Sequence, residues 1–416
     1  MLTKCGYLQS LATQKNINNE ISIEDIPGGY KSFELCAKFC YGIVITLHAF
    51  NVMAVRCASE YLQMTESLEK GNLGYKIEMF LNSIVFQSWK DCMISLQCTK
   101  SLQPWAEDLN LVNACINSIT FKACMDPSIS PSNKANDSLF DDSTSPWNDM
   151  QVIENHGDSE DWWMEDVCEL DIDLFQRVLL AIKSTGRMTP ELVGKSLRIY
   201  AYRWLPGLSR NQNLMETIQR GIQGGCDDSL ETLTKYKLLL ETIVGLLPSE
   251  KGSTSCSFLL KLLKAANLLL VTPSTKMELV RRIGMQLEEA SLNDLFIPSL
   301  SYASDSLYDV ELVQCIVEHY VMHLNSPLNP YNRRMTPSGE HFDLFDKGSS
   351  KCVMHGSELR VAKLIDQYLA EIARDSNLAL ETFIALAELI PDSARPMHDD
   401  LYGAIDIYLK VRQYSR

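Results

Sequence analysis

Three side chains that bind metals recur at regular spacing between residues 315 and 323. Cys315, His319 and His323 are four residues apart, and a helix would place all three on one face. A tetrahedral zinc ion needs its ligands around one point, whereas eight residues of straight helix extend about 12 Å. We therefore expect no metal here, with Cys315 in the core and the two histidines at the flank of a helix.

The chain has 13 cysteines, an odd number, and no CxxC pair. Nucleophilic catalysis by cysteine needs a histidine partner, and the seven histidines offer no convincing candidate. Several cysteines instead stand among apolar residues at helical spacing, namely Cys36, Cys40, Cys57, Cys92, Cys115, Cys256 and Cys315. We predict reduced thiols that pack as small hydrophobic side chains.

The sequence lacks the common catalytic motifs: the P-loop, the dinucleotide-binding glycine pattern, the nucleophile elbow, HExxH and the kinase signatures. The pair Asp399-Asp400 precedes an apolar helix, where carboxylates complement the helix dipole. Trp162-Trp163 is interpreted as an aromatic anchor that opens a helical region. The sequence therefore favours a protein that is not an enzyme and holds no cofactor.

Composition and charge argue against other classes of protein, such as nucleic-acid-binding and membrane-spanning proteins. The 416 residues are 46% hydrophobic and 22% charged, as in globular proteins. A net charge of −15 repels phosphate backbones, so we expect no nucleic-acid partner. No apolar run reaches 18 residues and the N-terminus has no hydrophobic signal region. We predict no transmembrane segment and a cytoplasmic location.

Two segments are predicted to be flexible. Residues 127–160 are rich in Ser, Asn, Asp and Pro, bury little apolar surface, and read as an acidic linker. Ser130 and Ser145 each precede proline there, a pattern of turns and also of phosphorylation sites. Residues 326–355 carry several prolines and glycines and read as a loop.

The first region reads as α+β grading into α. Residues 21–23 alternate, residues 32–41 have helical spacing, and residues 43–47 read as a short strand. Asn51 is a plausible N-cap for the helix that follows it. Helical spacing continues from residue 68 to residue 124, with a break near Pro104.

The second region, from residue 161, reads as almost wholly helical. Thr189 is predicted to be the N-cap of a helix whose first residue is Pro190. Thr275 and Glu278 have the spacing of a capping box at the start of another helix. Further helices are predicted over residues 230–247, 255–270, 310–323, 358–373 and 380–389. No fixed repeat length links them, so we expect no regular solenoid.

Longer strings carry a resemblance to a known family. LTKCGYLQSL, IEDIPGGYKSFELCAKFCYGIVITL and NVMAVRCASEYLQMTESLEKGNL resemble the later part of a plant BTB/POZ domain. DWWMEDVCELDIDLFQRVLLAIKSTGRM, ETIVGLLPSEKGSTSCSFLLKLLKAANLL and AEIARDSNLALETFIALAELIPDSARPMHDDLYGAIDIYLK resemble blocks of the non-phototropic-hypocotyl-three domain. The chain thus resembles the plant family that combines these two domains.

The resemblance implies a fold that is mainly α: a partial α+β BTB/POZ domain followed by an all-α domain. Its domains are predicted to span residues 1–66 (BTB/POZ), 67–126 (helical extension), 127–160 (linker) and 161–410 (helical domain). Against the family pattern, the chain begins after the first strands and helix and ends before later helices. We expect an incomplete BTB module.

The family implies a substrate adaptor of a cullin-three ubiquitin ligase, acting in plant light or auxin signalling. Its expected partners are cullin-three, a target such as a phototropin-type receptor kinase, and a second copy of the chain if the BTB fragment allows dimers. Besides the cytoplasm, a peripheral position at the plasma membrane is an expected location. The alternative is a non-ligase helical scaffold, or a dominant-negative fragment that binds targets without engaging a cullin.

The resemblance also points to particular residues. The cullin surface of BTB folds lies around the helix and loop that here contain Phe39, Tyr41 and Ile43. Buried packing is the alternative explanation of these three side chains. Tyr402 matches a position that is a candidate phosphotyrosine in family members, so we expect a phosphoprotein.

Overall fold

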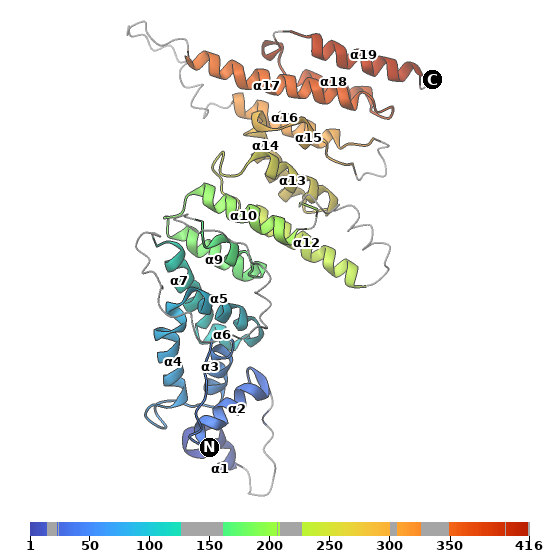
Figure 1. Cartoon of the computed structure of the whole chain (residues 1–416). Coiled ribbons are helices and arrows are strands. Elements are labelled where there is room, and N and C mark those ends of the chain that lie inside the picture. The colour runs from blue at the N-terminus through green and yellow to red at the C-terminus, as the bar shows by residue number, and fades with distance from the viewer. Residues whose placement is uncertain are drawn as a thin grey trace, which may run out of the picture. The chain divides into compact units, whose positions relative to one another are not determined.

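Figure 1 shows a computed structural model of the whole chain. The structure describes residues 1–14, 23, 25–125, 161–205, 207–208, 227–299, 306–325, 349–395 and 397–414. The chain divides into two compact units, an N-terminal unit (Met1–Thr189) and a C-terminal unit (Pro190–Arg416). The predicted linker at 127–160 and most of the predicted loop at 326–355 lie outside the described residues. The end of that loop, from Ser349, is helical.

The described part of the N-terminal unit is helical. Its α-helices are α1 (Gly6–Gln14), α2 (Gly29–Cys40), α3 (Val52–Tyr61), α4 (Leu73–Ser83), α5 (Trp89–Cys98), α6 (Trp105–Asp108), α7 (Leu111–Ala123), α8 (Met164–Val167) and α9 (Ile172–Ser184). The 3-10 turns η1 (Leu2–Lys4), η2 (Val85–Gln87) and η3 (Thr99–Leu102) join some of them. Helix α3 packs against α2 and α4, and α7 packs against α5 and α9.

The predicted strand at residues 43–47 is not formed. Within the described residues, the backbone N–H groups of Val44, Ile45 and Leu47 have no hydrogen-bond partner, so no ladder exists. The β-branched run favours a strand, but a strand forms only beside another. In the described residues the one recorded β-contact is an isolated bridge between Pro298 and Tyr308. The fold is therefore mainly α, as predicted, and the α+β character predicted for the first region is absent from its described part.

The segment 161–184 belongs to the N-terminal unit. Trp89 Nε1 donates to Asp166 Oδ2 at 2.6 Å, and the Trp89 and Trp162 rings meet edge to face. Arg177 donates to both carboxylate oxygens of Glu107. Helices α8 and α9 therefore fold onto α5, α6 and α7, and Met125 and Asp161 belong to the same unit. The boundaries predicted from sequence blocks stay predictions.

The C-terminal unit consists of stacked helices (Figure 1). They are α10 (Pro190–Trp204), α12 (Asp227–Leu246), α13 (Cys256–Leu268), α14 (Pro273–Gly284), α15 (Leu292–Leu295), α16 (Val310–Asn325), α17 (Ser349–Ile372), α18 (Leu380–Glu388) and α19 (Asp399–Tyr414), with the turn η5 (Leu287–Glu289). These bounds confirm the helices predicted for the second region, and α10 begins at the expected proline.

The contacts of these helices form two rows. In one row α10, α12, α14, α16 and α18 each contact the next, and in the other α13, α15, α17 and α19 do the same. Contacts of α13 with α12 and α14, and of α17 with α18, join the rows. The core side chains of these helices include Leu260, Leu263 and Ile283, which are fully buried. The helices differ in length from 4 to 24 residues, which agrees with the lack of a sequence repeat.

Within the described residues, no helix has the length and apolar character needed to cross a membrane.

Candidate docking surface

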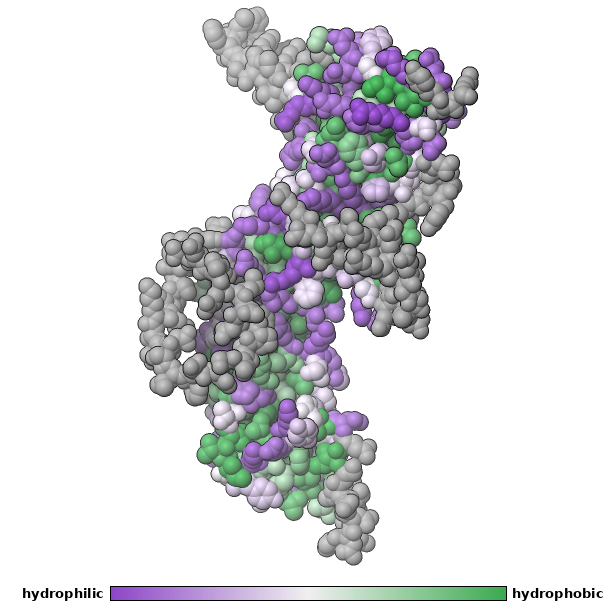
Figure 2. All heavy atoms as spheres, turned by 45° about the vertical axis from the view of Figure 1, so that its right-hand side comes forward, coloured by the Kyte–Doolittle hydropathy of each residue, from purple (hydrophilic) through white to green (hydrophobic). Residues whose placement is uncertain are grey.

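An uncharged, exposed segment follows α2. No residue from Phe39 to Val55 carries a formal charge. Within this run Tyr41 is 70% exposed, Ile43 54%, Val44 92% and Phe50 62%. Figure 2 shows hydrophobic surface over the described part of the N-terminal unit. We call residues 41–50 the apolar segment. Exposed apolar side chains that lie close together mark an interaction site more often than isolated ones do.

Asn51 holds the end of the apolar segment. Its Oδ1 accepts a hydrogen bond from the His48 backbone N–H at 3.0 Å, and its Nδ2 donates to the Thr46 carbonyl at 3.1 Å. Asn51 occupies the N-cap of α3, as predicted, but its side chain bonds the preceding segment and not the helix. Hydrogen bonds from the Asn51 side chain therefore hold the apolar segment in place, whereas a β-strand would be held by backbone hydrogen bonds to a neighbouring strand.

The three predicted contact residues lie in different settings. Phe39 is half-buried in the last turn of α2, and Lys4 Nζ and Lys76 Nζ lie 4.9 and 5.2 Å from its ring centre. These cation–π contacts hold the ring against its own unit. Tyr41 and Ile43 point into solvent, so packing does not account for them. Val44 and Phe50, which the sequence reading missed, share the segment; its lack of charge was the available signal.

The residues considered for metal binding stand on α16. His319 packs against Gly284 of α14, where an added Cβ would come within 2.8 Å of the His319 Cβ. Cys315 is half-buried and burial raises the pKa of its thiol. In the described parts of the chain, no cluster of three or more His, Cys, Asp or Glu side chains is arranged to hold a metal.

Most thiols are core groups. Cys36, Cys57 and Cys256 are buried, as their apolar neighbours predicted, while Cys40 is half-buried. Burial raises the pKa to about 12 for Cys36, about 11 for Cys57 and about 12 for Cys256. A thiol with such a pKa is almost wholly protonated near neutral pH and is a poor nucleophile.

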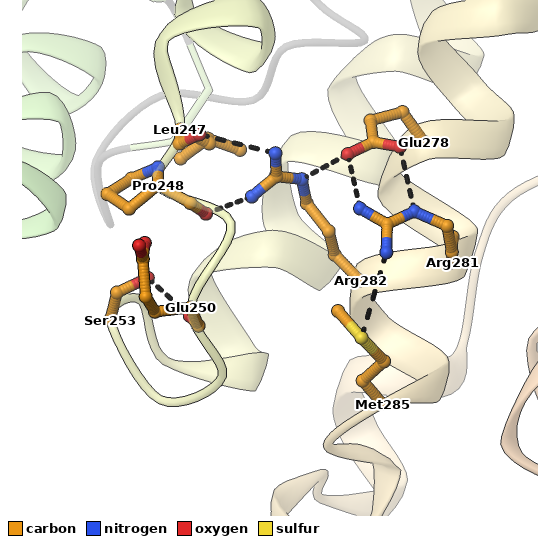
Figure 3. Close-up of polar contacts among 8 residues, drawn as sticks. All are labelled: Leu247, Pro248, Glu250, Ser253, Glu278, Arg281, Arg282 and Met285. Carbon is orange, nitrogen blue, oxygen red and sulfur yellow. Dashed lines mark hydrogen bonds and ion pairs between the residues drawn. The ribbon is translucent and has the colours of Figure 1, made fainter. Parts of the chain in front are cut away.

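A charged cluster fixes the turn after α12 in the C-terminal unit (Figure 3). Arg282 of α14 is nearly buried and donates to the carbonyl oxygens of Leu247, at 3.2 Å, and Pro248. Its Nε donates to Glu278 at 2.7 Å. Hydrogen bonds from Arg281, and then from Arg282, lower the pKa of Glu278. The Arg282 guanidinium binds the backbone carbonyls that follow the end of α12, so the cluster stabilises the packing of α14 against this turn.

Glu278 does not act in the expected capping box. Helix α14 begins at Pro273 with Thr272 as its N-cap, three residues before Thr275. Proline fits the first turn, where its missing N–H costs nothing, so the helix starts earlier than predicted. The Glu278 carboxylate is left to pair with the two arginines.

Tyr402 stands in the first turn of α19. Its side chain is 66% exposed, and its ring meets that of His398 edge to face at 6.3 Å. Asp399 and Asp400 begin the same helix, as predicted from its dipole. Tyr408, one turn and a half later, is buried and donates to the Leu378 carbonyl at 3.1 Å.

Comparisons with known proteins agree on one family. The model of the NPH3 family matches residues 161–414. A BTB/POZ domain-containing protein of Arabidopsis thaliana is 46% identical over 99% of this chain and 66% of its own length. The phototropic-responsive NPH3 family protein NPY2 of the same plant is 45% identical over 99% of this chain and 62% of its own. Root phototropism protein 3 of Arabidopsis thaliana is 37% identical over 94% of this chain and 62% of its own length. The chain therefore spans a little under two thirds of the length of these relatives. No solved structure matches it.

Proposed function

The chain belongs to the NPH3 family, and from this premise we propose that it is a non-catalytic adaptor that presents a target protein to a cullin-three ubiquitin ligase. Relatives named as BTB/POZ domain-containing and phototropic-responsive proteins support an adaptor role. The pathway we propose is plant light or auxin signalling, with a phototropin-type receptor kinase as the target. The site of action is the cytoplasm and the inner face of the plasma membrane.

One observation supports the location of the cullin surface. The apolar segment is exposed and uncharged, and it contains Tyr41 and Ile43. Aromatic and aliphatic side chains at the centre of an interface supply most of its binding energy. We propose that Tyr41 and Ile43 contact cullin-three directly, with Phe39 supporting them from the end of α2.

The test is binding of the purified chain to plant cullin-three by titration calorimetry. Ile43→Asp and Tyr41→Ala are each expected to weaken binding by at least about tenfold, equivalent to about 1.4 kcal/mol. Phe121→Asp is the matched control, since Phe121 is an exposed aromatic of the same unit on another helix, α7. Equal losses in all three variants would contradict this surface.

A second outcome separates the adaptor from the alternative function. If the chain fails to bind cullin-three while a full-length relative binds, the ligase role is wrong. A chain that still binds the target protein would then be the non-ligase scaffold or dominant-negative fragment. Light scattering of the same samples measures whether two copies associate.

We propose Tyr402 as a site of phosphorylation. Its hydroxyl is accessible, and a phosphate there would gain from the N-terminus of α19 but would stand beside Asp399 and Asp400. Phosphopeptide mapping of protein from plant tissue should find Tyr402 modified and the buried Tyr408 unmodified. Repeated maps that cover Tyr402 without phosphate would contradict the proposal.

A further inference from the structure

The side chains of His48 and Asn51 meet at the end of the apolar segment. Asn51 Oδ1 accepts a hydrogen bond from the His48 backbone N–H at 3.0 Å, and Asn51 Nδ2 donates to the Thr46 carbonyl at 3.1 Å. A backbone N–H only donates and a carbonyl only accepts, so these two bonds fix which end of the Asn51 amide is oxygen and which is nitrogen. The backbone thus sets the orientation of this amide.

The fixed amide decides where the neutral His48 ring carries its proton. Asn51 Nδ2 lies 3.0 Å from His48 Nε2. Because an amide nitrogen only donates, Nε2 accepts its second N–H, and the proton of the ring stands on Nδ1. In a protonated ring both nitrogens are donors. Nε2 would then turn an N–H toward the N–H of Asn51, and this hydrogen bond would be lost.

The backbone around His48 is anchored, while its ring belongs to the surface. The His48 carbonyl accepts from the Val52 backbone N–H at 3.0 Å, at the start of α3. The carbonyl of the buried Ala49 accepts from Ser95 Oγ of α5 at 3.1 Å. The His48 ring is exposed, and its centre lies 6.1 Å from that of the exposed Phe50 ring. The ring is therefore part of the surface that a partner would cover.

A positive charge on His48 would have no compensating group. The apolar segment borders α3 and α5, and also α2, where the Ile43 N–H donates to the Lys38 carbonyl. The charged side chains of these helices are Lys31, Glu34, Lys38, Arg56, Glu60, Lys90 and Asp91, and their other titratable side chains are cysteines and tyrosines. Among the described residues, none of these groups is hydrogen-bonded or ion-paired to the His48 ring. Lys38 pairs with Glu34, and Arg56 with Glu60.

We propose that docking at the apolar segment requires the neutral form of His48, so that acidification weakens it. The inference rests on the proposed function and adds a regulation of the same surface. Protonation removes a hydrogen bond that holds the segment, and it places a charge within residues 39–55, which otherwise carry none. A partner that covers the segment would have to desolvate this charge. Both effects oppose binding. Histidine changes its charge between about pH 5 and pH 8, so the effect lies in the range of cellular pH.

The first experiment reads the His48 ring in the free chain. The full chain is prepared with isotope-labelled histidine, and the ring nitrogens are observed by nuclear magnetic resonance. His48→Gln identifies the His48 signals by their loss. Near neutral pH these signals should show the proton on Nδ1, and Asn51→Ala should remove this preference. A neutral His48 that carries its proton on Nε2 would overturn the proposal, whatever the partner does.

The second experiment measures binding of the full chain to plant cullin-three by titration calorimetry, at about pH 7.5 and about pH 5.5. The affinity of the wild type should fall at least about threefold on acidification. His48→Gln should fall less, because glutamine stays neutral and its amide oxygen can accept from Asn51. His323→Gln is the matched control, since His323 stands on α16 in the other unit, and it should keep the wild-type fall. Circular dichroism at both pH values checks that each variant is folded.

The outcomes separate this inference from the proposed function. The histidines of cullin-three titrate equally against every variant, so the difference between variants reports His48. An equal loss of affinity in the wild type and His48→Gln, or tighter binding in acid, overturns the role of His48 and leaves the cullin surface standing. A wild type that binds cullin-three at neither pH contradicts the proposed function, and the inference falls with it.

Discussion

Arg395 and Asp366 form a buried ion pair in the C-terminal unit. Their side chains are 3% and 4% exposed, and Arg395 Nη2 lies 2.9 Å from Asp366 Oδ1. Arg395 also donates to the carbonyls of Ala387, at 2.9 Å, and Ile390, at 2.8 Å. The guanidinium thus joins α17 to the end of α18, and its buried charge is matched by one carboxylate and two carbonyls.

Asp366→Ala should destabilise the C-terminal unit strongly. Removing one partner of a buried pair leaves the other charge without compensation and typically costs about 3–5 kcal/mol. The measurement is the free energy of unfolding in urea, followed by circular dichroism. Lys410→Ala, which breaks the exposed pair with Asp406, is the control and should change little. Similar effects of both variants would contradict the stabilising role of the buried Arg395–Asp366 ion pair.

Residue patterns predicted the helices better than the contacts between them. In α9, Leu174, Val178 and Ile182 recur every four residues, a spacing that predicts one apolar helix face, and all three are buried. The Arg282 contacts join residues 34 and 35 positions apart in the sequence, which no local pattern encodes. Residues 43–47 of the apolar segment were predicted to form a strand because side-chain types report strand preference and not the presence of a neighbouring strand. The exposure of Tyr41 and Ile43 depends on which other parts of the chain pack nearby, and local sequence patterns do not encode this either.

At the scale of elements, α8 and α9 belong with the helices before them. The NPH3 match begins at residue 161, yet the compact units divide after Thr189. Trp163 is fully buried and Phe175 of α9 is too. Ion pairs between Glu107 and Arg177 and between Lys100 and Asp171 add to this packing. The start of the family domain therefore completes the fold of the N-terminal unit.

Trp163→Ala should loosen the N-terminal unit. Replacing a fully buried tryptophan by alanine typically costs about 3–5 kcal/mol, because apolar contacts are lost and a cavity remains. Trp204→Ala is the control, since Trp204 is an exposed residue at the end of α10. Thermal unfolding followed by near-ultraviolet circular dichroism measures both. An unchanged unfolding temperature in Trp163→Ala would argue against the docking of α8.

The Glu107–Arg177 contact predicts an acid-sensitive step. The hydrogen bond from Arg177 lowers the pKa of Glu107, so the contact stabilises the fold above the ordinary glutamate range and is lost as the pH falls through the lower folded pKa. Wild type should unfold at a higher temperature than Glu107→Gln at pH 7. The difference should begin to shrink near pH 4, the usual glutamate range, and vanish only once the pH lies below the lowered pKa of folded Glu107. A difference that is independent of pH would contradict this.

Over the whole molecule, stability is expected to vary along the two rows of helices. Each helix of the C-terminal unit contacts mainly its neighbours in the stack, as in repeat proteins, so opening can begin at one end. Helix α13 buries Leu259, Leu260 and Leu263, whereas α19 leaves Tyr402 and Leu409 exposed. The middle layers should therefore open less often than the last one.

Hydrogen exchange measured by mass spectrometry tests this gradient. Amides in the centre of α13 should exchange at least about tenfold more slowly than those in the centre of α19, a difference of about 1.4 kcal/mol in opening free energy. The peptides to compare are 257–267 and 402–412. Equal protection would mean that the C-terminal unit opens as a single cooperative body.

Met125, just after α7, and Asp161, just before α8, belong to the same compact unit, so the chain that joins them does not connect the two units. The entropy of closing a loop rises only with the logarithm of its length, by about 0.6 kcal/mol for each doubling. Evolution can therefore lengthen, shorten or rewrite these residues at small thermodynamic cost. New chain ends or a fluorescent protein placed there should leave the helices on either side in register.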